Sequence, residues 1–134
     1  MEKILESKWM DMTQGTYQAI QKIFEPGSIM KPFIMSIGIN EGKITPNTTY
    51  IDAGFVKVGP VTIYNFDRRK WGEQTMAGVL EKSINTGAVF VSQLISHQTF
   101  LDYLNKFGFS EKTGVELQGE VSSKNDINGP DVEF

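Results

Sequence analysis

The chain carries the segment Glu25-Pro26-Gly27-Ser28-Ile29-Met30-Lys31-Pro32-Phe33, and the position of its main helix follows from it. A serine and a lysine stand three residues apart, just after a Pro-Gly turn and at the start of an apolar run. Positions i and i+3 share one face of a helix, so the two side chains are expected to meet. Because proline is tolerated only near the first turn of a helix, Pro32 places the helix start close to Ser28.

This pair of side chains is suited to acyl transfer. A serine hydroxyl is a weak nucleophile that needs an adjacent base, and a desolvated lysine can lose its proton and become that base. The free N–H groups of a helix start also favour a developing oxyanion. The spacing alone occurs by chance in many helices, so its flanks carry the argument for Ser28 as nucleophile and Lys31 as base.

A second segment, Lys82-Ser83-Ile84-Asn85-Thr86-Gly87, lies at a break between two helical patterns. In isolation, Ser83 and Asn85 are typical of a helix end and a helix cap. Downstream of a Ser-x-x-Lys segment, however, a Ser-x-Asn element is typical of serine acyltransferases that react with penicillin. In that pairing the hydroxyl relays a proton, and the amide holds either the substrate or the lysine.

With both segments in place, residues 17–121 resemble the transpeptidase domain of class B penicillin-binding proteins. Three further segments carry the resemblance: Gly42–Tyr50, Gln74–Met76 and Phe107–Glu120. The resemblance implies an α+β, β-lactamase/transpeptidase-like fold, here mainly its helical part with a β-hairpin and without most of the central antiparallel sheet. It divides the chain into a poorly matched lead (1–16), a partial penicillin-binding transpeptidase domain (17–121) and a loose tail (122–134).

The resemblance also implies a function, that of a peptidoglycan D,D-transpeptidase acting on D-Ala-D-Ala stem peptides, with β-lactam antibiotics as further ligands. Ser28, Lys31 and Ser83 would be catalytic and Asn85 would bind substrate. No cofactor or metal is expected, since the chain has no Cys and His97 is its one His. The parent protein would work at the outer face of the bacterial cytoplasmic membrane or in the periplasm, although the chain shows no anchor or signal pattern.

Some positions depart from the family pattern. Its third active-site element is a Lys-Thr-Gly or Lys-Ser-Gly on a sheet strand. Lys112-Thr113-Gly114 has those residue types, but it follows Phe107-Gly108-Phe109, which is the context of a structural loop in the family, so we predict no catalytic role for it. At two other positions, where members of the family usually have His and Pro, this chain has Trp71 and Gln118. Without the third element, the isolated chain is expected to be a weak enzyme or inactive.

Two alternatives remain open at this stage. One is a sensor of β-lactams or stem peptides that is acylated without turnover. The other is a fragment without chemistry that self-associates into a homo-oligomer through exposed apolar faces. A net charge of −3 and a pI of about 5.1 argue against nucleic acid as a partner.

Periodicity and turn residues predict the local elements. We expect helices over 28–41, 75–83, 86–95 and 97–107, and a hairpin in which 55–58 and 61–64 flank Gly59-Pro60. Residues 43–50 and 65–73 are expected to be loops, and residues 2–12 a weak helix or a disordered lead.

Overall fold

The computed structural model describes residues 10–11, 16–22, 25–109, 111–117 and 119–121. They fall into two compact units. The first combines the described residues up to Glu25 with those from Leu104 onward, and the second runs from Pro26 to Tyr103. The second unit contains all four of the predicted site residues.

The first unit is small. Strand β1 (Met10–Asp11) pairs antiparallel with β2 (Thr16–Tyr17), and the short helix α1 (Gln18–Gln21) follows. The strand at residues 10–11 contradicts the weak helix or disordered lead predicted over 2–12, because pairing with a strand further along the chain overrides a weak local helical pattern. The rest of that prediction, and the loose tail predicted for 122–134, lie outside the described residues.

Residues 111–117 and 119–121 of the same unit lie outside helices and strands, and one carboxylate connects them. Glu120 accepts hydrogen bonds from the N–H and hydroxyl of Thr113, both at 2.6 Å, and from the N–H of Gly114 at 3.2 Å. Residues 112–114 lie in no strand. The Lys-Thr-Gly triplet is therefore part of an exposed loop in which Thr113 and Gly114 donate hydrogen bonds to Glu120.

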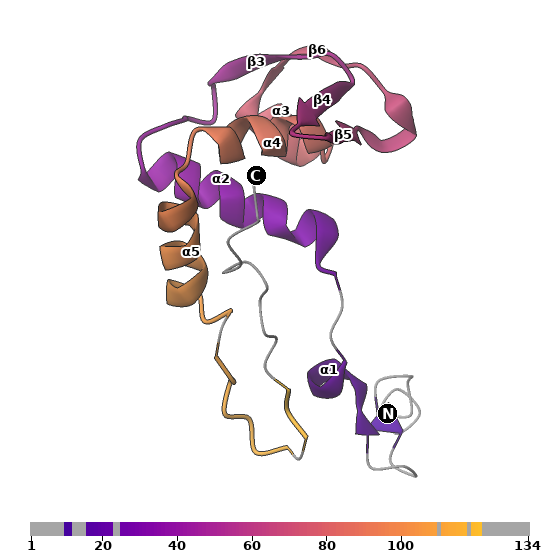
Figure 1. The fold of residues 1–134 in the computed structure, drawn as a ribbon, viewed down its shortest axis with the longest axis vertical. Coiled ribbons are helices and arrows are strands. Elements are labelled where there is room, and N and C mark those ends of the chain that lie inside the picture. Colours follow the sequence, from indigo (N-terminus) through magenta and orange to yellow (C-terminus); the bar gives the residue numbers. More distant parts are fainter. Residues whose placement is uncertain (1–9, 12–15, 23–24, 110, 118, 122–134) are drawn as a thin grey trace, which may run out of the picture. The chain divides into compact units, whose positions relative to one another are not determined.

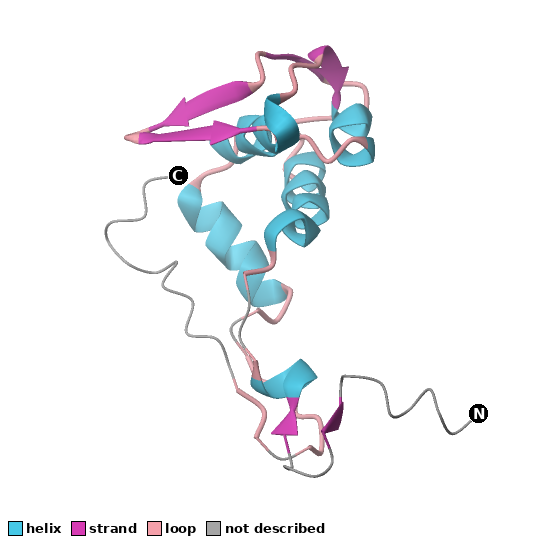
Figure 2. Cartoon of the chain, turned by 90° about the vertical axis from the view of Figure 1, so that its right-hand side faces the viewer, coloured by secondary structure: helices cyan, strands magenta, loops and turns pink. Residues whose placement is uncertain are grey.

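The second unit has three layers, which Figures 1 and 2 show from two sides. A 3₁₀ turn (Gly27–Met30) leads into α2 (Lys31–Asn40), and α3 (Met76–Glu81) and α4 (Asn85–Gln93) pack on that helix. Two antiparallel strand pairs lie on the far side of α3 and α4: β3 (Thr49–Asp52) with β6 (Gly72–Thr75), and β4 (Phe55–Val58) with β5 (Val61–Tyr64). The last helix is α5 (His97–Lys106).

The core of this unit forms where the three helices meet. Its buried members are Met35, Ile37, Ile44, Met76, Val79, Ile84, Val91 and Ile95. Two glycines allow the helices to approach closely. A Cβ at Gly38 would lie 2.8 Å from Val91, and one at Gly87 would lie 2.4 Å from Val79. Any larger residue at either glycine would push α4 away from its neighbour.

Three helices end with the same hydrogen-bonded cap, the Schellman motif. In α2, Gly42 and Lys43 donate to the carbonyls of Ile39 and Gly38 at 3.0 and 2.9 Å. The equivalent bonds close α3 through Ser83 and Ile84, and α5 through Gly108 and Phe109. This cap needs a residue with positive φ, which is usually glycine. At the end of α3 the residue is Ser83, with φ of +54°.

The structure confirms most of the predicted elements. The hairpin has the predicted strands with Val58 opposite Val61, and the four predicted helices are present with ends shifted by a few residues. The prediction of loops over 43–50 and 65–73 was wrong where β3 and β6 pair. Local periodicity could not reveal this pair, because each strand has four residues and the partner lies at least twenty positions away.

Candidate active site

Lys31 is the centre of the site. It is the first residue of α2, and only 7% of it is exposed. Its Nζ lies within hydrogen-bonding distance of four oxygens: Ser28 Oγ at 3.0 Å, Ser83 O at 2.8 Å, Ser83 Oγ at 2.9 Å and Asn85 Oδ1 at 2.7 Å. An ammonium has three hydrogens, so it cannot satisfy all four at once. A neutral amine has two hydrogens and a lone pair, which can accept the proton of a hydroxyl.

The surroundings of Lys31 favour its neutral form. Burial lowers the pKa of this lysine from its ordinary value of 10.5. The four oxygens belong to hydroxyls, an amide and a peptide carbonyl, none of which carries a full negative charge. A lysine in such a place is suited to the role of general base.

Ser28 lies in the 3₁₀ turn that precedes α2, and its side chain is exposed. Gly27 has a φ of +56° and provides the sharp entry that the Pro-Gly pair predicted. Pro32 occupies the first turn of α2, where its missing N–H has no intrahelical partner to lose. The local sequence therefore presents the serine hydroxyl to solvent and the lysine amine to the hydroxyl.

Ser83 reaches Lys31 because of its unusual backbone. A non-glycine residue with positive φ is strained by roughly 1 kcal/mol or more. At Ser83 this conformation, part of the cap of α3, turns both its carbonyl and its hydroxyl toward the lysine amine. Strain of this kind is common at functional sites.

Asn85 begins α4, and both ends of its amide are engaged. Its oxygen accepts from Lys31 at 2.7 Å, and its nitrogen donates to the carbonyl of Tyr64 at 2.8 Å. In the reverse orientation the amide nitrogen would face the lysine amine, donor against donor. The amide oxygen would face the carbonyl of Tyr64, acceptor against acceptor. Of the two roles open from sequence, holding the lysine is the one present in this structure, and one amide hydrogen remains for a substrate.

A cleft of about 370 Å³ opens over these residues, lined by Ser28, Tyr64, Asn65, Phe66, Lys82, Ser83 and Asn85. Trp71 is not among the lining residues. It packs against the core, with the cationic groups of Arg69 and Lys82 over its ring at 5.8 and 5.3 Å.

Two polar residues that the sequence did not single out, Asp52 and Asn65, are buried beside the site. They lie at the end of β3 and just after β5, and neither belongs to a recognisable spacing pattern. A carboxylate and an amide flanking predicted strands would be the only sequence signal, and that signal is common on protein surfaces.

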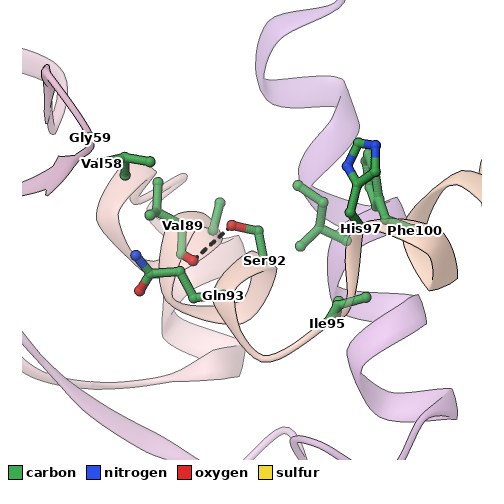
Figure 3. A pocket seen from close by; sticks show the side chains of 10 residues that line it. Val58, Gly59, Val89, Ser92, Gln93, Ile95, His97 and Phe100 are labelled. Carbon is green, nitrogen blue, oxygen red and sulfur yellow. Dashed lines mark hydrogen bonds between the residues drawn. The ribbon is translucent and has the colours of Figure 1, made fainter. Parts of the chain in front are cut away.

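A second and larger hollow of about 640 Å³ lies elsewhere on the same unit (Figure 3). Val89, Ser92 and Gln93 of α4 line one side of it, and His97 and Phe100 of α5 line another. Its serine, Ser92, donates to the carbonyl of Val89 at 2.8 Å in its own helix. The smaller cleft, in which one lysine amine meets the hydroxyls of Ser28 and Ser83, is the better candidate for chemistry.

Comparison with known proteins agrees with this geometry. The family described as penicillin binding protein transpeptidase domain matches residues 5–132. The chain belongs to this transpeptidase family.

Curated relatives include the penicillin-binding protein PbpB of Mycobacterium tuberculosis, which is 34% identical over 102 residues, 76% of this chain and 15% of that protein. The peptidoglycan D,D-transpeptidase MrdA of Escherichia coli is 29% identical, over 78% of this chain and 17% of its own length. The chain thus spans less than a fifth of the length of either relative.

Solved structures of transpeptidase domains share the fold. The domain of penicillin-binding protein 3 from Burkholderia pseudomallei has a TM-score of 0.75 and 26% identity, and the match covers 81% of this chain and 33% of that one. Penicillin-binding protein 3 of M. tuberculosis, solved with ampicillin, has a TM-score of 0.72 and 33% identity, with 79% of this chain and 24% of that one covered. The fold is therefore the β-lactamase/transpeptidase fold, of which this chain forms a part.

Two further properties bear on the site. Within the described residues, no group of His, Cys, Asp and Glu side chains could hold a metal ion. The helices of those residues also include none that is long and apolar enough to cross a membrane.

Proposed function

We propose that the chain carries the nucleophile side of a peptidoglycan D,D-transpeptidase site, with Ser28 as nucleophile, Lys31 as base, Ser83 as proton relay and Asn85 as the residue that holds the lysine and a substrate amide. The single observation that supports this most strongly is the position of one buried lysine amine between the hydroxyls of Ser28 and Ser83. Membership of the transpeptidase family supports the proposed substrate class.

In the first half-reaction, Ser28 Oγ attacks the carbonyl carbon between the two D-alanines of a stem peptide. The hydroxyl proton passes to the neutral amine of Lys31. The C–N bond then breaks, and the departing D-alanine amine takes a proton that Ser83 relays from Lys31. The product is an ester between the peptide and Ser28.

In the second half-reaction, an amine of a neighbouring stem peptide attacks the ester carbonyl. Lys31 accepts the proton of that amine, directly or through Ser83, and Ser28 leaves with a proton from Lys31. A new amide bond links the two peptides, and the enzyme returns to its starting state. The parent protein would carry out this reaction at the outer face of the bacterial cytoplasmic membrane or in the periplasm.

The isolated chain is expected to react slowly. The N–H of Ser28, at the start of a helical turn, can serve as one donor to the oxyanion. The second donor would come from the third element of the family pattern, and loss of one such donor typically lowers the rate by about a hundredfold or more.

Intact-mass spectrometry after prolonged incubation with benzylpenicillin tests this proposal, with Ser28→Ala as the matched control. We expect a slowly formed adduct of one benzylpenicillin on the parent chain and none on the variant. Circular dichroism should confirm that both samples are folded.

Three other outcomes would overturn the proposal in different ways. An adduct on both proteins would place the nucleophile elsewhere. A benzylpenicillin adduct without any acyl transfer from a D-Ala-D-Ala peptide to an acceptor amine would favour a sensor of β-lactams. Absence of an adduct, together with a mass that rises with protein concentration in sedimentation, would favour a non-catalytic, self-associating fragment.

A further inference from the structure

Besides the hydrogen bonds around Lys31, the second unit has another polar network, which is buried and takes no part in the reaction. Its centre is Asp52, whose side chain is fully buried, with 0% exposure. Asp52 accepts four hydrogen bonds. Those to Oδ1 come from Gly54 N at 2.8 Å and Thr86 Oγ1 at 2.7 Å, and those to Oδ2 come from Asn65 Nδ2 and Trp71 N, both at 2.8 Å.

Asn65 connects this carboxylate to the active-site helix. While its nitrogen donates to Asp52, its oxygen accepts from the backbone N–H of Thr86 at 3.1 Å. Thr86 lies in the first turn of α4, and the residue before that helix, Ile84, provides no side-chain cap. Asn65 therefore caps α4 from a distant part of the chain, and its orientation is fixed by Asp52.

The residues next to this link are the ones that hold Asn85. Tyr64, which precedes Asn65, supplies the carbonyl that accepts the amide nitrogen of Asn85. Thr86, which follows Asn85, is held by both Asn65 and Asp52. The Asn85 amide is thus anchored from both sides, with its oxygen facing Lys31.

We propose that Asp52 is a positioning residue of the active site, which acts through Asn65 to keep the oxygen of Asn85 on the amine of Lys31. This inference rests on the proposed function, in which Lys31 is the base. Asp52 touches neither the substrate position nor the reacting atoms.

The titration of the Lys31 amine tests this inference without needing any acylation. NMR of the chain labelled with ¹³C at lysine Cε reports the pKa of each lysine, and Lys31→Arg identifies the Lys31 signal. Failure of the benzylpenicillin experiment and failure of this inference are therefore separate results.

The variant Asp52→Ala should lower the pKa of Lys31 further, by roughly one unit, because the ammonium loses its shortest acceptor when Asn85 is released. Mere loosening of the structure would instead let water in and raise that pKa toward 10.5. A rise, or no change, would overturn the inference.

The variant Asp52→Asn separates hydrogen bonding from charge. With its oxygen toward Asn65 and Trp71, the new amide keeps both of those donors satisfied, and the Thr86 hydroxyl can reverse to accept from its nitrogen. The N–H of Gly54 loses its acceptor, but it lies outside the link that runs through Asn65 to Asn85. We expect the Lys31 pKa to stay near that of the parent chain. A fall as large as that of the alanine variant would show that the charge of Asp52 acts through space, and the inference would be wrong.

A double-variant cycle tests whether the effect of Asp52 on Lys31 passes through Asn85. In an Asn85→Ala background, Asp52→Ala should have no further effect on the Lys31 pKa. A persisting effect would exclude Asn85 as the intermediary. Ile44→Ala, which opens the core at a site away from this network, is the matched control and should not lower the pKa.

If Asp52→Ala does not fold, Asn65→Ala removes the link while it leaves three of the four donors on Asp52. It should lower the Lys31 pKa in the same direction. If neither variant folds, Asp52 serves the fold rather than the site, and the inference is overturned.

Discussion

Lys31 and Asp52 are the two buried charged side chains among the described residues, and each has four hydrogen-bonding partners. The structure favours the uncharged form of Lys31 and the charged form of Asp52. Burial lowers the pKa of Lys31, which favours the uncharged form. For Asp52, burial would raise the pKa, but the four hydrogen bonds together outweigh it, and the net pKa lies below the ordinary 3.8.

The difference follows from the partners of each group, which are hydrogen-bond donors around Asp52 and uncharged acceptors around Lys31. A carboxylate has lone pairs for all four of its donors, so Asp52 is fully satisfied only as an anion. None of the four acceptors around the lysine carries a full negative charge, so an ammonium there would have no opposite charge to balance it. One buried group is thus kept in a fixed state, and the other is kept ready to exchange a proton.

The largest expected effect comes from making Lys31 unable to deprotonate. Lys31→Arg should lower the rate of benzylpenicillin acylation by about 10²- to 10⁴-fold, because a guanidinium stays protonated and cannot accept the proton of Ser28. Time-resolved intact mass would measure it. Lys57→Arg, an exposed lysine in the hairpin, is the control and should react like the parent chain. An unchanged rate in Lys31→Arg would remove Lys31 from the role of base.

Removal of the other charge should mainly affect stability. Asp52→Ala leaves four donors without their acceptor, and we expect a loss of about 3 kcal/mol or more in the free energy of unfolding. Urea denaturation would measure it. The control is Glu81→Ala, whose carboxylate is exposed at the end of α3 and which should change stability by less than about 0.5 kcal/mol. Equal effects of the two variants would contradict the assigned importance of the buried network.

Acid should weaken the same network. Because the folded pKa of Asp52 lies below its ordinary value of 3.8, its contribution to stability is complete above that value and is lost as the pH falls through the folded pKa. The parent chain should therefore lose more stability than Asp52→Asn between about pH 5 and pH 2. Urea midpoints across this range would show it, and parallel curves for the two proteins would disprove it.

Replacement of Lys31 by an apolar residue should have little effect on stability. Lys31→Met removes a buried ammonium whose desolvation opposes folding, so the change should lie within about 1 kcal/mol of the parent. The pH dependence of the stability difference between the two proteins shows whether the lysine opposes folding. The parent should gain stability relative to the variant as the pH rises from the folded pKa of Lys31 to 10.5, where the unfolded chain still binds the proton. A strongly destabilised variant would show that the lysine holds the fold.

The smallest effect is expected at Ser83. Ser83→Gly should raise the free energy of unfolding by up to about 1 kcal/mol, since glycine adopts a positive φ without strain. The same change removes the hydroxyl that faces Lys31 and should slow acylation. Gly108→Ala, at the equivalent position of α5, is the reverse control and should destabilise. A destabilised Ser83→Gly would contradict the assignment of strain there.

Local patterns were sufficient to predict the helices, the hairpin and the three residues that contact Lys31. The Pro-Gly turn placed Ser28. Gly42 and Gly108 marked helix ends, and Gly59-Pro60 marked the hairpin. Two features were beyond such patterns. The β3–β6 pair joins two short strands far apart in sequence, and the Asp52 network joins four separated segments through side chains that are ordinary surface residues elsewhere. The role of Asn85 toward Lys31 needed coordinates, because a spacing of two residues fits both substrate and lysine.

The long separations within the site have a kinetic consequence. Lys31 meets Ser83 and Asn85 across 52 and 54 positions of the chain. Contacts over such distances form only after large loops have closed, which is slow compared with helix formation. During refolding, helical content should return first, and reactivity of Ser28 should return only when α2 has docked on α3 and α4. A penicillin that marks Ser28 would then also mark, molecule by molecule, the chains that have completed their last folding step.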